Sequence, residues 1–546
     1  LVGSEMCIRD RISMDTTAPR VNRNAAGPLA GYSLRGFLQF ITHNTGQLVV
    51  AALFLLLAFG QKLFSNTFSI DTQGIIQNND ALYRSWFELE RFGLVLFKKL
   101  TGTYLYNNAL ASFTMVVFFG MSAVVWAYFL CSASRDTKLQ PAFFMIPYVV
   151  SPIFAEMLGF LLQGPEISIA AVLTAISLMM WANAATNRSI KRRIPLVIAA
   201  IVCATISFTM YLAMVTIFIT GTAMLYVLRF GSRAQWDEQK KSSWIFLIGS
   251  ILIFGASYLA YRLLNAVAMH LAGVTTNAYI SDQSRWGKDS FGTIIRNIVH
   301  HAQELYSGSG IFYSVLFPVI AIIFAVGAII CAIRKRITVL AVLVSILLLL
   351  APMIMSIVFG AAPSVRTEMT YPLAFSFITA VSFAIITCII QRNAKSIVKI
   401  IPWILIIAIG WNQALITSRI FYTENIVFNQ DVLTAQAIKS RIDKLGLGER
   451  PDEPLVFVGN HVAKCNPDCY SANQLGLTGR SMLEIGFSTE HGTGIKKQFM
   501  ADILGVYYNS ATSQQIEQSE RLAESMPHWP DPGSVAEKDG IVIVNF

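Results

Sequence analysis

Residues 194–228 read IPLVIAAIVCATISFTMYLAMVTIFITGTAMLYVL and contain no charged residue. An upright helix needs only about 20 residues to cross a membrane, so this run is too long for one helix. Basic residues flank both ends, with RSIKRR at 188–193 before the run and Arg229 and Arg233 after it. Since Lys and Arg prefer the cytoplasmic side of a membrane, both ends are expected to lie inside. The run therefore predicts a tight helical hairpin with an even number of crossings.

The rest of the chain is similarly apolar. Of its 546 residues, 54% are hydrophobic and 14% are charged, whereas a soluble globular protein has about 25% charged residues. The net charge of +10 does not indicate a nucleic-acid partner, because Lys and Arg cluster in short loops between the apolar runs. We predict a polytopic α-helical membrane protein with about eleven spans. The predicted spans are 47–64, 109–131, 141–161, 166–186, 194–208, 210–228, 244–265, 311–333, 337–359, 371–391 and 400–418.

The basic loops alternate with less basic ones along the chain, and no reversal of this pattern is needed. The external side is then expected to receive the long loops 65–108 and 266–310 and the short segment 360–370. Within the second long loop, residues 291–305 predict an amphipathic helix that lies in the membrane interface. The first residues, LVGSEMCIRDR, resemble translated sequencing-adapter read-through. The sequence thus predicts an artefact at 1–13, a cytoplasmic segment at 14–46, a membrane domain at 47–418 and an external domain at 419–546.

The external domain differs in composition from the rest of the chain. Strand-like runs (LVFVG, SMLEIGF and IVIVNF) alternate with helical patterns (DVLTAQAIKSRIDKL and TSQQIEQSERLAESM). This alternation predicts a small α/β domain. Cys465 and Cys469 are expected to form a local disulfide if the domain is extracytoplasmic. The sequence has no GxGxxG, Walker loop or HExxH, and its His residues show no metal-site spacing, so no cofactor is expected, although a divalent metal stays open.

Acidic residues follow the first span closely. Asp71 is expected at the bilayer surface, where a carboxylate could take the proton from a sugar hydroxyl. The alternative is a turn or N-cap residue, since IDTQG has turn character. The role of Asp80 is equally open between a catalytic base and a residue at the start of a helix, because NND precedes the helical pattern ALYRSWF.

Other charged residues near the external side are candidates for substrate binding. Arg84 and Glu88 lie on a predicted interfacial helix, where exposed ion pairs are the alternative reading. Arg91 could hold a phosphate through its planar fork. Glu156 lies near the external end of the third span, where an ionisable residue is costly and so a functional candidate. Glu166 is a further candidate for substrate binding. Its alternative role is an acid at the N-terminus of a helix, where the macrodipole favours a negative charge.

Four stretches together resemble the bacterial serotype-converting glucosyltransferases, the Gtr type II family of the GT-C class of membrane glycosyltransferases. They are FSIDTQGIIQNND with ELERFGLVLFKKL (68–80 and 88–100), SPIFAEMLGFLLQGPEISIA (151–170), SRIFYTENIVFNQDVLTAQAIKSRI (418–442) and MPHWPDPGSVAEKDGIVIVNF (526–546). The resemblance runs from about residue 48 to the C-terminus. The family's Gly-Arg pair is Glu90-Arg91 here, and Thr72 replaces the second acid usually found beside Asp71.

The resemblance implies a donor, glucose on undecaprenyl phosphate, at the external face of the bacterial inner membrane. It implies an acceptor such as a lipid-linked O-antigen unit of lipopolysaccharide, and a transfer that inverts the sugar. Asp71 would be the base with Asp80 in reserve, Arg91 would hold the donor phosphate, and Glu156 would line the sugar pocket. A transporter or flippase of lipid-linked glycans is the alternative, although such proteins show internal repeats that this sequence lacks. A non-catalytic scaffold stays open as well.

Overall fold

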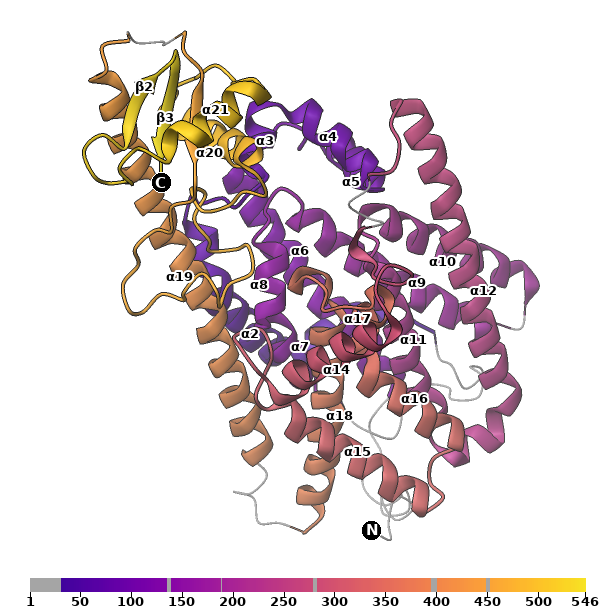
Figure 1. The fold of residues 1–546 in the computed structure, drawn as a ribbon. Helices are drawn as coiled ribbons and strands as arrows, with labels where there is room; N and C mark the ends of the chain where they lie inside the picture. Colours follow the sequence, from indigo (N-terminus) through magenta and orange to yellow (C-terminus); the bar gives the residue numbers. More distant parts are fainter. Residues whose placement is uncertain (1–30, 135–138, 188, 278–281, 394–399, 448–451) are drawn as a thin grey trace.

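The computed structural model describes residues 31–134, 139–187, 189–277, 282–393, 400–447 and 452–546 (Figure 1). The predicted artefact at 1–13 and most of the predicted cytoplasmic segment at 14–46 lie outside the described residues. The described part of the chain is mostly helical, and its three short strands lie beyond residue 454.

Eight helices of the described chain are long and apolar enough to cross a membrane. They are α2 (Leu34–Phe64), α6 (Asn108–Ala133), α9 (Gly164–Thr186), α10 (Ile190–Met210), α12 (Arg233–Ala272), the run Val339–Phe359, α18 (Thr370–Asn393) and α19 (Ile401–Asp443). The run Val339–Phe359 comprises α16 (Val339–Leu350), a 3-10 turn and α17 (Ile354–Phe359). A ninth candidate is the pair α7 (Pro141–Val149) and α8 (Pro152–Leu158), which is bent by 54°. Two shorter apolar helices are α11 (Met214–Phe230) and α15 (Phe317–Ile333).

The prediction of a polytopic helical membrane protein is confirmed at this level, and the count of eleven spans stays a prediction. The run 194–228 is divided as expected, because α10 ends at Met210 and α11 begins at Met214. Small polar residues join α9 to α10: Ser177 Oγ donates to the carbonyl of Ala200 at 2.7 Å. Small side chains of this kind let membrane helices approach closely.

Three short helices follow α2 and lie at the same end of the molecule as the C-terminal sheet (Figure 1). They are α3 (Thr72–Gln77), α4 (Asn79–Glu88) and α5 (Phe92–Thr101). The predicted helix start at NND is confirmed, since the Asn78 side chain accepts the Ala81 N–H and caps α4. The segments predicted to be external also meet here. For example, the backbone N–H of Asn277 donates to the carbonyl of Glu88 at 3.1 Å.

The predicted amphipathic helix at 291–305 is confirmed as α14 (Phe291–Ser307). Ile294 and Leu305 are buried, whereas Ile295 is 41% exposed. A short 3-10 turn, η2 (Val365–Thr367), lies in the segment between α17 and α18. This turn contacts α8, so it is held against the bent pair.

The C-terminal part contains a sheet of β1 (Leu455–Val458), β2 (Val535–Lys538) and β3 (Ile541–Asn545). The strand order is β1-β3-β2, with β1 parallel and β2 antiparallel to β3. Alternate residues of β3 face opposite sides, as in any strand. Val542 and Val544 pack with α20 (Thr489–Leu504), whereas Ile541 and Ile543 pack with α21 (Ser513–Ala523).

Two details of the C-terminal part differ from expectation. The stretch SMLEIGF at 481–487 was predicted as a strand, but it forms turns, because Ser481 Oγ and the Met482 N–H both donate to the Asp431 carboxylate. The helical pattern DVLTAQAIKSRIDKL is the last part of α19, which continues without a break through residue 419. The sequence did not indicate one continuous helix, because its apolar run ends near residue 418.

Candidate active site

Asp71 lies between the end of α2 and the start of α3. Its backbone φ is 74°, in the left-handed region that non-glycine residues adopt uncommonly. Although it occupies the N-cap position of α3, its side chain makes no capping hydrogen bond. Asp71 is an exposed residue in a turn, so of the two structural roles that the sequence left open it has the turn position without the capping hydrogen bond.

Three basic side chains from distant parts of the chain act electrostatically on Asp71. Burial raises the pKa of Asp71, and Arg366, Arg91 and His491 oppose this effect. Arg91 precedes α5, Arg366 lies in η2 and His491 lies in the first turn of α20. The segment after α2, the segment before α18 and the C-terminal part therefore each place a basic side chain within electrostatic reach of Asp71.

Arg91 is held by contacts on two sides. Its Nη1 donates to Gln163 Oε1 at 3.0 Å, and its guanidinium lies over the Tyr211 ring at 5.1 Å. Tyr211 is the C-cap residue that directly follows α10, in the middle of the long apolar run. The break between α10 and α11 thus provides an aromatic surface beneath the predicted phosphate-binding arginine.

The residues next to Arg91 pack the segment between α4 and α5 against α10 and α12. Glu90 is buried with a φ of 60° and accepts hydrogen bonds from Tyr261 Oη at 2.6 Å and Arg262 Nη1 at 2.9 Å. A Cβ added to Gly93 would lie 2.0 Å from Thr209 Oγ1, so only glycine allows this approach to α10. The Glu-Arg-Phe-Gly sequence at 90–93 therefore fixes where Arg91 lies.

A buried acid, Glu368, follows Arg366 by two residues. Glu368 is fully buried, and Tyr313 Oη donates to its two carboxylate oxygens at 3.0 Å each. His301 Nε2 of α14 lies 3.5 Å from Glu368 Oε2. Burial raises the pKa of Glu368, and His301 opposes the rise. This cluster ties η2 to α14, which leaves the Arg366 guanidinium over the Phe160 ring at 5.2 Å.

Arg91 and Arg366 line the same cavity, which has a volume of about 290 Å³. Most of the other lining residues are apolar or aromatic and come from α11, α12, α17 and the break after α10; they include Tyr211, Leu212, Val215, Met355, Val358 and Phe359. Guanidinium groups suit a phosphate, and apolar walls suit a hydrocarbon chain. The cavity therefore fits a lipid that carries a phosphate.

Glu156 binds the backbone of a C-terminal loop. It is buried on α8, and its two carboxylate oxygens accept the backbone N–H groups of Leu477 at 2.7 Å and Thr478 at 3.0 Å. A Cβ on Gly476 would lie 2.4 Å from this carboxylate. In this structure Glu156 anchors the C-terminal part to the membrane helices, and its predicted contact with a sugar stays a prediction.

The remaining predicted site residues make structural contacts. Glu166 is buried and pairs with Lys98 at 2.8 Å. Asp80 accepts a hydrogen bond from the Tyr104 hydroxyl. Arg84 donates to the carbonyl of Gly273 at 3.3 Å, and Glu88 is half-buried at the end of α4. These contacts hold the segment 65–107 together and connect it to α9 and α12, and the roles of these side chains toward a substrate stay predictions.

Arg366, His491 and Tyr211 are site residues that were not predicted from the sequence. Arg366 had a usable signal, because it is a charged residue in a short segment between two long apolar runs. His491 and Tyr211 had none, since only the folding of the chain brings them to Asp71 and Arg91. Among the described residues, no group of three His, Cys, Asp or Glu could hold a metal ion.

Comparison with known proteins gives one match. A family model described as glucosyl transferase GtrII matches residues 60–389, which is more than half of the chain. The matched region contains Asp71, Arg91 and Arg366 and does not extend to the C-terminal sheet. No curated protein and no solved structure matches the chain.

Proposed function

We propose, since this chain belongs to the glucosyl transferase GtrII family, that it moves glucose from undecaprenyl phosphate to a lipid-linked glycan. The transfer takes place at the external face of a bacterial inner membrane, with the N-terminus in the cytoplasm. One observation carries the proposal: Asp71, an exposed residue, lies under the electrostatic influence of two arginines that line a mainly apolar cavity. This arrangement suits a reaction at the phosphate of a membrane lipid.

The charges of Asp71, Arg91 and Arg366 give each side chain a role in the proposed transfer. The acceptor hydroxyl oxygen bonds to the anomeric carbon of glucose while the bond from that carbon to the phosphate oxygen breaks. Asp71 takes the hydroxyl proton as general base, and attack from the face opposite the phosphate inverts the sugar. Arg91 and Arg366 stabilise the negative charge that grows on the leaving polyprenyl phosphate. The donor is already activated, so no nucleotide takes part in this step.

The surroundings of Asp71 suit this role. A general base works best when its pKa lies close to the working pH. Burial raises the pKa of Asp71 from its ordinary value of 3.8, and the nearby cations limit the rise. Since the base acts in its ionised form, transfer is expected to decline as the pH falls through this raised pKa.

The donor side of the proposal is tested with purified protein in liposomes. The substrates are polyprenyl-phosphate glucose with a radiolabelled sugar and a lipid-linked glycan acceptor. Arg366→Gln and Arg91→Gln should each lower transfer by about 10²-fold or more, because each removes a charge from the transition state. Arg521→Gln is the matched control, since Arg521 is an exposed arginine in the last turn of α21 and does not line the cavity. Wild-type transfer in both cavity variants, or transfer from a nucleotide sugar alone, would contradict the proposal.

A further inference from the structure

A second cavity lies between α19 and the C-terminal loops, apart from the one that contains Arg91. Its volume is about 260 Å³. Val427 of α19 forms part of its wall, and the rest comes from the loop residues 462–484. The disulfide between Cys465 and Cys469 lies in this wall. The proposed donor chemistry makes no use of this cavity.

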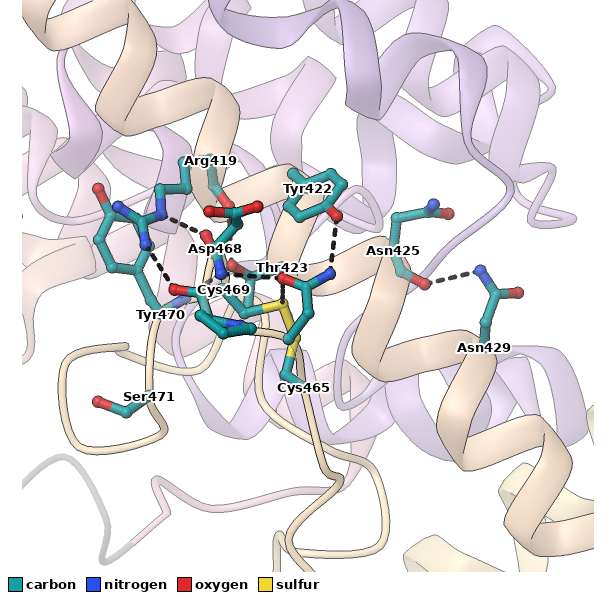
Figure 2. Close-up of a disulfide and its surroundings, with 12 residues drawn as sticks. Arg419, Tyr422, Thr423, Asn425, Asn429, Cys465, Asp468, Cys469, Tyr470 and Ser471 are labelled. Atoms are coloured by element: carbon teal, nitrogen blue, oxygen red, sulfur yellow. Dashed lines mark hydrogen bonds between the residues drawn. A yellow bond between two sulfur atoms is a disulfide. The ribbon is translucent and has the colours of Figure 1, made fainter.

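The cavity is preformed, because its loop is fixed onto α19 (Figure 2). Arg419 of α19 lies over the Tyr470 ring at 4.6 Å and donates to the carbonyls of Pro467 and Asp468. Asn466 Nδ2 donates to Tyr422 Oη at 2.9 Å. With the disulfide, these contacts hold the loop in one arrangement before any ligand arrives, which lowers the entropy cost of binding.

The lining residues suit a neutral, polyhydroxylated ligand. Arg480 and Glu484 both line the cavity and form an ion pair with each other, so their charges compensate. The pair is partly exposed and can offer donors and acceptors together, as sugar hydroxyls require. Tyr470 supplies an aromatic ring, which Arg419 covers on one side, and the Ser471 hydroxyl, which donates to Asn473 and Gln474, can still accept a hydrogen bond. The cavity that contains Arg91 and Arg366 differs, because these two arginines favour an anionic ligand.

The cavity is connected to Asp71 through a short series of contacts. Leu475 and Gly479 of its wall flank the loop that binds Glu156. A Cβ on Gly159 would lie 2.4 Å from Thr478 Oγ1, so this loop lies tightly against the end of α8. Ser69 Oγ, two residues before Asp71, donates to the Gly159 carbonyl at 3.4 Å.

We propose that this second cavity binds sugars of the acceptor glycan and presents the acceptor to Asp71. The inference rests on the proposed glucosyl transfer and adds to it a glycan-binding site formed by α19 and the C-terminal loops. Because the site is built from residues outside the matched family region, its lining can set which glycan is modified without altering the donor site.

The test measures binding separately from transfer. The probe is oligosaccharide released by mild acid from the surface glycan of the producing cells and freed of its lipid. Its binding to purified full-length protein is followed by saturation-transfer NMR. The double variant Arg480→Gln/Glu484→Gln should weaken binding by about tenfold or more, since hydrogen bonds to charged groups are the strong ones. The same double variant should raise the KM for the acceptor by a similar factor and leave the KM for polyprenyl-phosphate glucose unchanged.

The matched control is Lys439→Gln/Asp443→Asn, which removes another ion pair of the same spacing on α19, away from the cavity. Wild-type affinity in the Arg480→Gln/Glu484→Gln protein would overturn the inference. So would a wild-type protein that transfers glucose but binds none of the oligosaccharide. Binding that depends on this pair in a protein that transfers no glucose would support the glycan site and count against the proposed function instead.

Discussion

Lys62 and Glu424 form a buried ion pair that joins α2 to α19, and its loss should destabilise the protein strongly. Lys62 Nζ lies 2.7 Å and 2.8 Å from the two carboxylate oxygens, and the side chains are 0% and 4% exposed. Lys62 Nζ also donates to the Thr67 carbonyl at 3.3 Å. The pair therefore anchors the segment that leads to Asp71.

The substitution Lys62→Met keeps the length of the side chain and removes its charge. It leaves the Glu424 carboxylate with Thr67 Oγ1, at 3.3 Å, as a remaining partner. Breaking a buried pair by removing one partner costs about 3–5 kcal/mol, because an uncompensated charge stays buried. Replacing both partners by apolar residues is often neutral, so Lys62→Met/Glu424→Met should recover most of the lost stability.

The free energy of unfolding is measured in mixed micelles as the fraction of dodecyl sulfate increases. Lys62→Met should unfold at a clearly lower fraction than the wild type, and the double variant should unfold near the wild-type fraction. Two results would refute the reasoning. One is a single variant as stable as the wild type, and the other is a double variant as unstable as the single one.

Three further outcomes are expected. Gly93→Ala should destabilise the protein by about 1–3 kcal/mol and lower transfer, since its Cβ would overlap Thr209; unfolding and transfer assays measure both. Glu368→Gln should raise the donor KM by about tenfold, because Arg366 loses its fixed position; steady-state kinetics report it. Burial lowers the pKa of Lys496 from 10.5 to about 8, so Lys496→Met should be more stable than the wild type at pH 7. That advantage should shrink between about pH 8 and 10.5, where the unfolded chain binds a proton that the folded protein does not; thermal unfolding at several pH values follows it.

Each of these outcomes has a control, a second variant or a result that would contradict it. Gly255→Ala should have little effect, because a Cβ at this position on α12 meets nothing within 4 Å. Tyr313→Phe removes the hydroxyl that donates to Glu368 and should raise the donor KM in the same direction. An unchanged KM in both Glu368→Gln and Tyr313→Phe would show that the cluster does not position Arg366. A stability difference at Lys496 that is constant with pH would contradict the assigned pKa.

The membrane helices could be predicted because their signal is local. An uninterrupted run of apolar residues specifies a helix wherever it lies, and the basic residues beside residues 194–228 were enough to divide that run in two. The end of α19 could not be predicted in this way. Its helix continues past the last apolar residues because Asp431 and its neighbours pack against the C-terminal loops.

The site was predictable only in part, for the same physical reason. Asp71 and Arg91 are close in sequence and follow the first span, so their common location could be inferred. Arg366 and His491 reach Asp71 only after the helices have packed. Glu156 had the expected burial, but its partners are backbone N–H groups of Leu477 and Thr478, which carry no side-chain signal in the sequence.

The most direct test of the central claim is the single-turnover rate of glucose transfer by Asp71→Asn, measured with bound polyprenyl-phosphate glucose. Asparagine keeps the shape of the side chain and removes its ability to take a proton. The account predicts a fall in rate of about 10²–10⁴-fold with donor affinity unchanged, as expected for loss of a general base. Asp80→Asn should transfer at the wild-type rate, since Asp80 contacts Tyr104 instead. Wild-type transfer by Asp71→Asn would contradict the account.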